Sequence, residues 1–221
     1  MQRRREPELN GGTEDARTDR MEIVAAALLA LATVATAWSG YQASRWNGEQ
    51  AQAFSRGNAA RIESTRASAL ADAQTQIDVA TFTSWVDAYA QKQTLLADFY
   101  LKRFRQEFKP AVDAWVATRP LQNANAPLTP FAMPQYQLAA RQEASELELD
   151  AEAWSAKARA NVQRATNYVL GVVLFASALF FAGMSAKLRT RRLRMVLLSF
   201  GIVVFLGTVA WIATFPISIS I

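Results

Sequence analysis

Three long apolar segments interrupt an otherwise polar chain, at residues 22–40, 168–186 and 195–216. Each is close to the ~20 residues that a helix needs to cross the ~30 Å hydrocarbon core of a bilayer. Apart from the boundary residue Glu22, these segments contain no Asp, Glu, Lys or Arg. The pattern predicts an all-α membrane protein with three transmembrane helices. Driven transporters keep charged residues within their spans, so such a function is disfavoured.

The polar segments differ greatly in length. Residues 1–21 have little apolar surface and are expected to form a disordered cytoplasmic tail, and residues 217–221 a short outer C-terminus. The large domain lies between the first two spans, at residues 41–167. It contains neither Gly nor Pro from Asn58 to Lys109, and it is rich in Ala, Gln, Glu, Arg and Leu. This composition predicts a coiled-coil-like bundle of long helices.

The need to return to the membrane limits how far the first of these helices can run. One helix from Gly40 to Lys109 would extend on the order of 100 Å, whereas the last segment, residues 135–167, would cover about half of that. We therefore expect the first helix to end near Ala71 and the chain to turn over residues 72–78. Thr75-Gln-Ile-Asp78 offers a capping arrangement there.

A second helix is expected from Ile77 to Phe108, followed by a proline-rich connector. Its apolar stripe is typical of a buried core and consists of Phe82, Trp85, Tyr89, Leu96, Tyr100, Phe104 and Phe108. Pro110 ends or kinks this helix. Four prolines between Arg119 and Pro134 then predict a stiff, extended connector, pinned to the bundle by Phe131 and Met133.

Charged side chains in this domain form two groups. Acids on the last helix are expected to pair with arginines on the first, and these residues are Glu143, Glu146 and Asp150 with Arg56, Arg61 and Arg66. A divalent-cation site is the alternative, but a straight helix face spreads its oxygens along a line. The basic group contacts anionic lipid or forms a solvated face, and it consists of Lys102, Arg103, Arg105 and Lys109.

A basic loop at residues 187–194 joins the second and third spans. It holds five basic residues and no acid, namely Lys187, Arg189, Arg191, Arg192 and Arg194. The loop accounts for the whole formal net charge of +5, because the charges elsewhere cancel. Cytoplasmic loops are enriched in Lys and Arg, so we expect this loop and the N-terminus to be cytoplasmic and residues 41–167 to be extracytoplasmic. The chain is thus expected in the bacterial cytoplasmic (inner) membrane, as a multi-pass protein.

Aromatic residues at the span ends support the same orientation. Trp and Tyr favour the headgroup level, and here they would lie at the outer membrane interface, at Trp38, Tyr41, Trp46, Tyr168 and Trp211.

Small residues follow one face of the first span. They are Ala26, Ala30, Thr33, Ala37 and Gly40. Such a seam lets helices approach closely in lipid, which predicts helix packing and self-association as a homo-oligomer. For the first apolar segment, a cleaved signal peptide is the alternative to a transmembrane helix, because Ala35-Thr36-Ala37 fits a cleavage site. The long, acid-containing segment before this span disfavours cleavage.

The composition removes several kinds of chemistry. The chain has no Cys and no His, and therefore no thiol nucleophile, no thiolate metal site and no histidine base. It contains no nucleotide-binding, hydrolase or metal-binding motif. We expect no catalytic, cofactor-binding or metal site and no cofactor, and we do not expect an enzyme. Because the net charge is confined to the basic loop, we expect no nucleic-acid partner either.

Residues 37–46, with the sequence A-W-S-G-Y-Q-A-S-R-W, are followed by Gly48-Glu-Gln-Ala51. This juxtamembrane segment resembles one found in small uncharacterised bacterial inner-membrane proteins that carry a helical insert between the first span and a C-terminal two-span hairpin. The resemblance implies this architecture and a bacterial origin, and it transfers no site residues.

These observations favour a membrane protein that acts through protein–protein contacts of its helical domain, as a scaffold, an accessory subunit or a sensor. Its expected partners are the lipid bilayer, further copies of itself and an unidentified protein. The alternative is a passive oligomeric channel or pore subunit, because a pore needs no buried charge. Its lining hydroxyls would be Thr33, Thr36, Ser39, Ser177 and Ser199.

Overall fold

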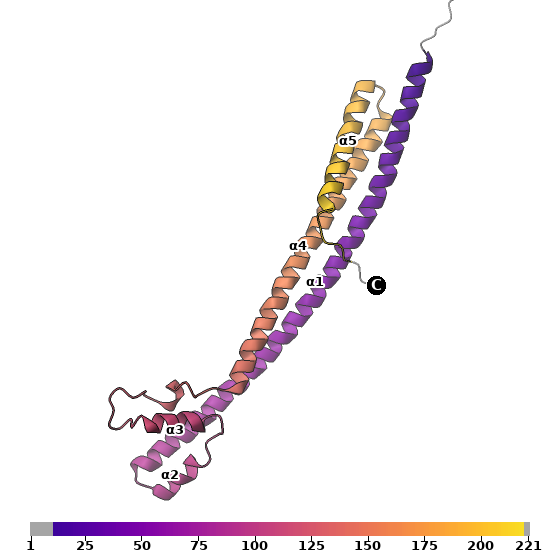
Figure 1. The fold of residues 1–221 in the computed structure, drawn as a ribbon. Helices are drawn as coiled ribbons and strands as arrows, with labels where there is room; N and C mark the ends of the chain where they lie inside the picture. The colour runs from indigo at the N-terminus through magenta and orange to yellow at the C-terminus, as the bar shows by residue number, and fades with distance from the viewer. Residues whose placement is uncertain (1–10, 219–221) are drawn as a thin grey trace, which may run out of the picture. The chain divides into compact units, whose positions relative to one another are not determined.

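The structure is a computed structural model that describes the backbone of residues 11–218 and the side chains of residues 20–218. It is all-helical over this range (Figure 1), with the elements α1 (Gly11–Ala90), α2 (Thr94–Leu101), α3 (Lys109–Ala117), the 3₁₀ turn η1 (Pro130–Ala132), α4 (Ala139–Lys187) and α5 (Arg191–Ile212). The helix α1 includes residues 11–21 of the expected disordered tail, and residues 1–10 of that tail lie outside the described residues.

The chain forms two compact units. The span unit comprises Met1–Gln52 and Lys157–Ile221, and the insert unit comprises Ala53–Ala156. Three helices are long and apolar enough to cross a membrane, and they lie in Arg20–Ala90, Ala139–Lys187 and Arg191–Ile212. The expected number of apolar spans is therefore confirmed.

The span unit packs α1, α4 and α5 through small side chains. At one end, Ala25 and Leu28 of α1 contact Ala182 of α4 and Leu198 of α5. Further along, a Cβ at Gly171 of α4 would collide with the side chain of Ile212. These contacts place small residues where helix backbones approach, as expected for helices in lipid.

The expected small-residue seam of the first span lies outside this packing. All five of its residues are exposed, and the buried stripe of α1 is instead the neighbouring one, Ala25, Leu28, Ala32 and Ser39. A Cβ at Gly40 would meet nothing within 4 Å. The seam is thus open in the single chain, and its role in self-association stays a prediction.

In the insert unit, α1 continues through the segment where a turn was expected. The predicted end near Ala71 and turn over residues 72–78 are wrong, because α1 runs unbroken to Ala90. Thr75 does not cap a new helix, since its hydroxyl donates to the Ala71 carbonyl 2.8 Å away, within α1. The chain turns after α1, where Lys92 adopts a left-handed φ of 59°.

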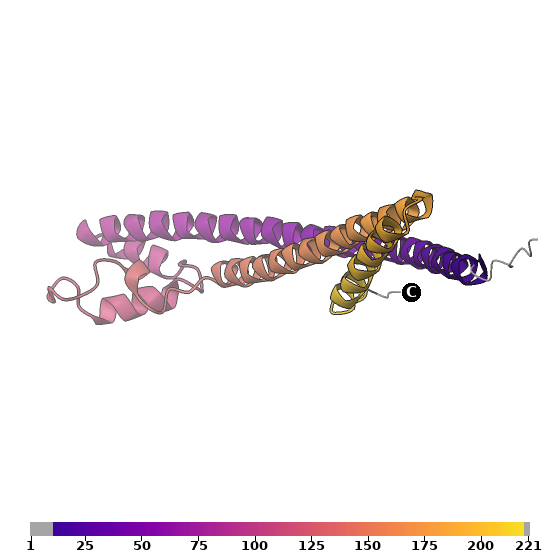
Figure 2. The same cartoon turned by 90° about the horizontal axis from the view of Figure 1, so that it is seen from above.

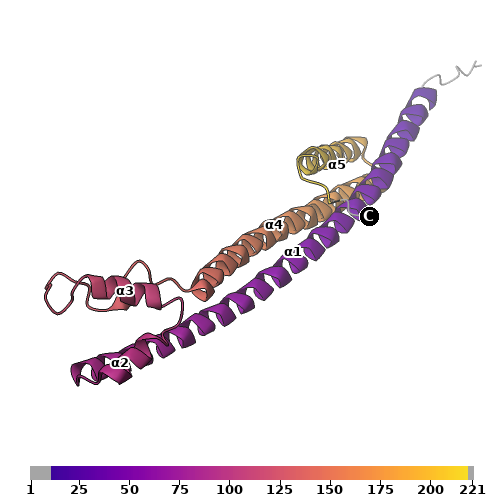
Figure 3. The same cartoon turned by 60° about the horizontal axis from the view of Figure 1, so that its bottom comes forward.

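The predicted second helix and extended connector are also wrong. Residues 77–90 belong to α1, and the rest of Ile77–Phe108 forms the short helix α2 and turns (Figure 3). The proline-rich segment folds back on α3 instead of extending, because Trp115 Nε1 donates to the Pro127 carbonyl at 2.7 Å. The backbone of this segment forms successive hydrogen-bonded turns, and η1 is one of them.

Two long helices run side by side in the insert unit, where α4 returns antiparallel to α1 (Figure 2). Ala144 and Ala151 are buried seven residues apart, and Gly57 lies against the Ala151 carbonyl. The Ser64 hydroxyl donates to the Ala144 carbonyl at 2.9 Å. No break separates the expected last helix of the domain from the second span, since α4 includes both.

The expected ion pairs between these helices form with different partners. Arg61 pairs with Glu148 at 3.7 Å, not with the predicted acids. Arg66 pairs with Glu63 on its own helix, and Arg56 lies over the ring of Trp154. An additional pair joins Arg141 to Asp72 at 2.8 Å. Each of these exposed pairs contributes under ~1 kcal/mol to stability. Their main effect is therefore on the register between α1 and α4.

Candidate functional site

An aromatic core closes the insert unit. Phe82 of α1 packs against Phe104, Phe108 and Val112, and its ring meets the Trp115 ring edge-on at 5.5 Å. Phe131 stacks on Phe108 at 5.0 Å between ring centres. The expected role of the aromatic stripe as core is confirmed for Phe82, Phe104 and Phe108, although its residues come from three segments and not from one helix. Such ring pairs add to the free energy gained by burial.

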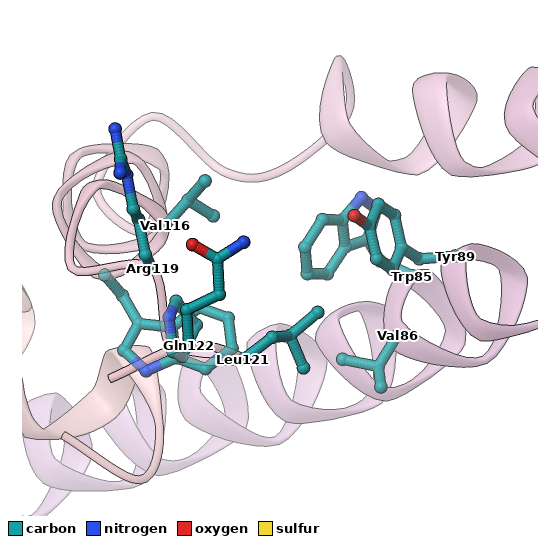
Figure 4. Close-up of a pocket in the computed structure, with 9 residues that line it drawn as sticks. Trp85, Val86, Tyr89, Val116, Arg119, Leu121 and Gln122 are labelled. Carbon is teal, nitrogen blue, oxygen red and sulfur yellow. The ribbon is translucent and has the colours of Figure 1, made fainter. Parts of the chain in front are cut away.

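An open groove lies beside this core (Figure 4). Its volume is about 280 Å³, and its lining consists of Trp85, Val86, Tyr89, Trp115, Val116, Arg119, Pro120, Leu121 and Gln122. Trp85 and Tyr89 of α1 stack at 5.7 Å and form one wall. The other wall is the end of α3 and the loop after it, from which Leu121 and the Gln122 amide project (Figure 4).

The lining of this groove is mainly apolar and aromatic. It contains no carboxylate, serine or threonine, and Arg119 is its only charged residue. The groove is slightly smaller than the 300 to 1,000 Å³ or so of typical small-molecule pockets. It is open to solvent, and Leu121 is 84% exposed.

A buried polar network joins three segments of the insert unit. The Asp78 side chain is only 1% exposed, and its Oδ2 accepts a hydrogen bond from Arg105 Nη1 at 2.8 Å. The Tyr136 hydroxyl lies 3.1 Å from the same oxygen and 3.3 Å from Thr75 Oγ1. Arg105 also pairs with Glu107, whose Oε1 accepts from the backbone N–H at the start of α4. The network thus fastens α1, the loop before α3 and the first turn of α4.

Burial shifts the pKa values of two groups in this network. Desolvation raises the pKa of the Asp78 carboxyl above its ordinary value, although the Arg105 charge and the hydrogen bonds from Tyr136 and Arg105 act in the opposite direction. Burial likewise raises the pKa of the Tyr136 hydroxyl. Asp78 Oδ1 is buried without a hydrogen-bond partner, which adds to the cost of the charged form. This network was not predicted from the sequence, because Arg105 and Tyr136 lie 27 and 58 residues from Asp78.

Most of the basic group at residues 102–109 has intramolecular partners. Arg105 belongs to the buried network, Lys109 pairs with Asp113 at 3.1 Å, and Arg103 lies over the Phe99 ring at 3.9 Å. A contact of this group with anionic lipid stays a prediction.

The expected interface aromatics gather in the span unit. Trp46 and Tyr168 are buried in one cluster with Ile212 and Phe215, and the Trp211 ring meets the Phe215 ring edge-on, with centres 4.8 Å apart. Trp38 and Tyr41 lie side by side on α1, with ring centres 5.9 Å apart.

The same part of the span unit holds the end of the described chain, which the sequence did not predict. The buried Gln42 amide bonds both backbone groups of Ser218, accepting from N at 3.0 Å and donating to O at 3.4 Å. The Tyr168 hydroxyl donates to the Pro216 carbonyl at 3.2 Å.

The basic residues between the second and third spans differ in exposure. Lys187, Arg189, Arg191 and Arg192 are exposed, whereas Arg194 is buried and pairs with Glu22 at 3.4 Å. This pair joins the starts of the first and third apolar segments.

The hydroxyls expected to line a pore are mostly bonded within their own helices. Thr33, Thr36 and Ser177 each donate to the carbonyl four residues earlier. Ser39 is buried, and Ser199 is exposed.

Among residues 20–218, no group of three or more acids is placed to hold a metal ion, so the alternative cation site at Glu143, Glu146 and Asp150 is not formed.

Comparison with known proteins gives no match to a family model, to a curated protein or to a solved structure. The resemblance of residues 37–46 to a bacterial membrane family therefore stays a prediction.

Proposed function

We propose that the chain is a bacterial inner-membrane protein that acts through protein–protein contacts of its helical insert unit, as a scaffold, an accessory subunit or a sensor. The groove between α1 and the loop after α3 carries this proposal. A rigid aromatic core supports its walls, and its lining has binding surface without catalytic groups.

The occupant we propose is an extended segment of a partner protein. Aromatic-lined grooves bind extended, proline-containing segments through their flat ring faces. Trp85 and Tyr89 supply such faces here, and the volume of about 280 Å³ fits one or two side chains. Arg119 lies at the groove and favours a partner segment with a carboxylate next to its apolar side chain.

Site-specific photocrosslinking in bacterial cells tests this function. A photoreactive phenylalanine analogue at Leu121 lies in the groove, whereas the same analogue at Leu128 lies in the same loop outside it. Both leucines are exposed, at 84% and 94%. We expect a discrete crosslinked protein from position 121 and not from position 128, identified by mass spectrometry.

Charge reversal at the groove separates specific capture from chance collisions. The Arg119→Glu variant should reduce the crosslink at position 121 about tenfold, because the partner's carboxylate would be repelled. Equal products at positions 121 and 128, or a product unaffected by Arg119→Glu, would contradict the proposal. A product with twice the mass of the chain would identify a second copy as the occupant.

A further inference from the structure

Two arginines flank the junction of α1 and α4 in the span unit. The helices meet there through Ala43, Trp46, Ala165 and Tyr168. The guanidinium of Arg164 lies over the indole ring of Trp46, 4.6 Å from its centre. Arg45, which precedes Trp46, is half-buried. Both side chains therefore leave the helices next to the last apolar contacts of this unit.

Neither arginine is neutralised by a carboxylate among the described residues. Arg164 donates to the neutral Asn161 Oδ1 at 3.1 Å, and Arg45 Nε has no acceptor. The surrounding segments, residues 41–52 and 158–168, contain three arginines and only one acid, Glu49. This part of the span unit thus carries a positive charge that no ion pair among the described residues balances.

The height of the two arginines matches that of lipid phosphates. Arg45 lies five residues beyond Gly40, the end of the first apolar segment, and Arg164 lies four residues before Tyr168, the start of the second. At 1.5 Å per residue they are ~7.5 Å and ~6 Å beyond the hydrocarbon core. The headgroup layer occupies roughly the first 5 to 8 Å on each side. This agreement holds whichever face of the membrane the junction occupies.

We infer that Arg45 and Arg164 bind the phosphate groups of phospholipids around the spans, with a preference for anionic headgroups. A guanidinium forms paired, charge-assisted hydrogen bonds with phosphate oxygens. Two further donors nearby, Trp46 Nε1 and Asn161 Nδ2, lack acceptors. They are shielded from solvent, so a phosphate reaches them only after a side chain moves, and the two guanidinium groups carry the binding.

Native mass spectrometry of the full chain in detergent, titrated with phosphatidylglycerol, tests this site. We expect Arg45→Gln and Arg164→Gln each to weaken lipid binding about fivefold, and the double variant to weaken it further. The matched control is Arg159→Gln, which removes the same charge from an exposed position ~13 Å beyond the second apolar segment and should bind as the wild type does. Phosphatidylcholine should bind more weakly than phosphatidylglycerol.

Competition with inorganic phosphate and a circular dichroism measurement complete the test. Displacement of the lipid by millimolar inorganic phosphate would show a site for free phosphate and overturn the lipid assignment. Wild-type affinity in the double variant, or an equal loss in Arg159→Gln, would overturn the role of these two arginines. Circular dichroism verifies the fold, and if the double glutamine variant loses helicity, Arg45→Lys with Arg164→Lys keeps the charge and should retain the preference for phosphatidylglycerol.

Discussion

Asp78 is a buried carboxyl group whose environment makes the stability of the insert unit depend on pH. Its folded-state pKa is raised by burial, so the unfolded chain releases this proton at a lower pH than the folded chain does. The stability contributed by the carboxyl is therefore complete below its ordinary pKa and is lost as pH rises through the raised value. The slope is at most about 1.4 kcal/mol per pH unit between those two values.

Asp78→Asn should remove this contribution. We expect the free energy of unfolding of the wild type, relative to that of the variant, to increase as pH falls through the raised pKa. Urea titrations of the detergent-purified chain, followed by tryptophan fluorescence at several pH values, measure this difference. Asp72→Asn is the control, because Asp72 is 63% exposed in its pair with Arg141 and should show little change. A difference with the opposite sign would mean that Arg105 outweighs desolvation.

Gln42 has a different role, which is to hold the end of the described chain in the span unit. Its side chain is fully buried and bonds both backbone groups of Ser218. Gln42→Leu should release residues 213–218 at a cost of about 1 to 3 kcal/mol, since the Ser218 groups lose their partners. Hydrogen exchange of the C-terminal peptide should then accelerate by about tenfold or more. Gln52→Leu changes an exposed glutamine and should leave this peptide unaffected.

At the scale of the element, the spans and the aromatic core could be predicted, whereas the helix ends of the insert unit could not. Hydropathy and residue spacing are local properties, and they located the apolar helices and the buried rings Phe82 and Phe108. Thr75 and Asp78 resemble a helix cap in the local sequence. In the structure the Thr75 hydroxyl donates within α1, and the Asp78 carboxylate accepts from Arg105, 27 residues away. The actual end of α1 follows from Lys92 in a left-handed conformation, with no Gly or Pro to indicate it.

The continuity of α1 has a direct test in hydrogen exchange. Amides of residues 72–78 should be as protected as those of residues 60–69, because all of them donate within one helix. This helix contacts α4 at Ser64 and Asp72, and Arg105 and Tyr136 at Asp78. We expect both peptides to exchange at least about a hundredfold more slowly than the turn at residues 91–93. Rapid exchange confined to residues 72–78 would restore the turn that the capping pattern suggested.

For the whole molecule, we expect the charge at each end of the spans to set the orientation in the membrane. Residues 187–194 hold five cations without an acid, whereas residues 41–52 and 158–168 hold three arginines and one acid. The excess favours a cytoplasmic position for residues 187–194.

The chain has no cysteine, so a single introduced cysteine is the one thiol that a reagent can label. Thr190→Cys should be shielded from an impermeant thiol reagent in intact cells and Asn123→Cys should be labelled, and the reverse pattern would invert the orientation.

Self-association is the property for which the open seam of α1 matters most. Its residues are exposed, whereas the neighbouring stripe is buried against other helices of the same chain. A second copy can therefore pack against the seam without displacing an intramolecular contact.

Replacing Ala30 and Ala37 with Leu separates the helix backbones and should weaken a dimer about tenfold. The control Ala27→Leu makes one such replacement, on the exposed stripe that contains Leu31 and Val34, and it should have no effect. Mass photometry in detergent over a range of concentrations measures the dissociation constant. A wild-type monomer at the highest concentration would show that the seam faces lipid, and equal weakening by Ala27→Leu would place the contact on the other stripe.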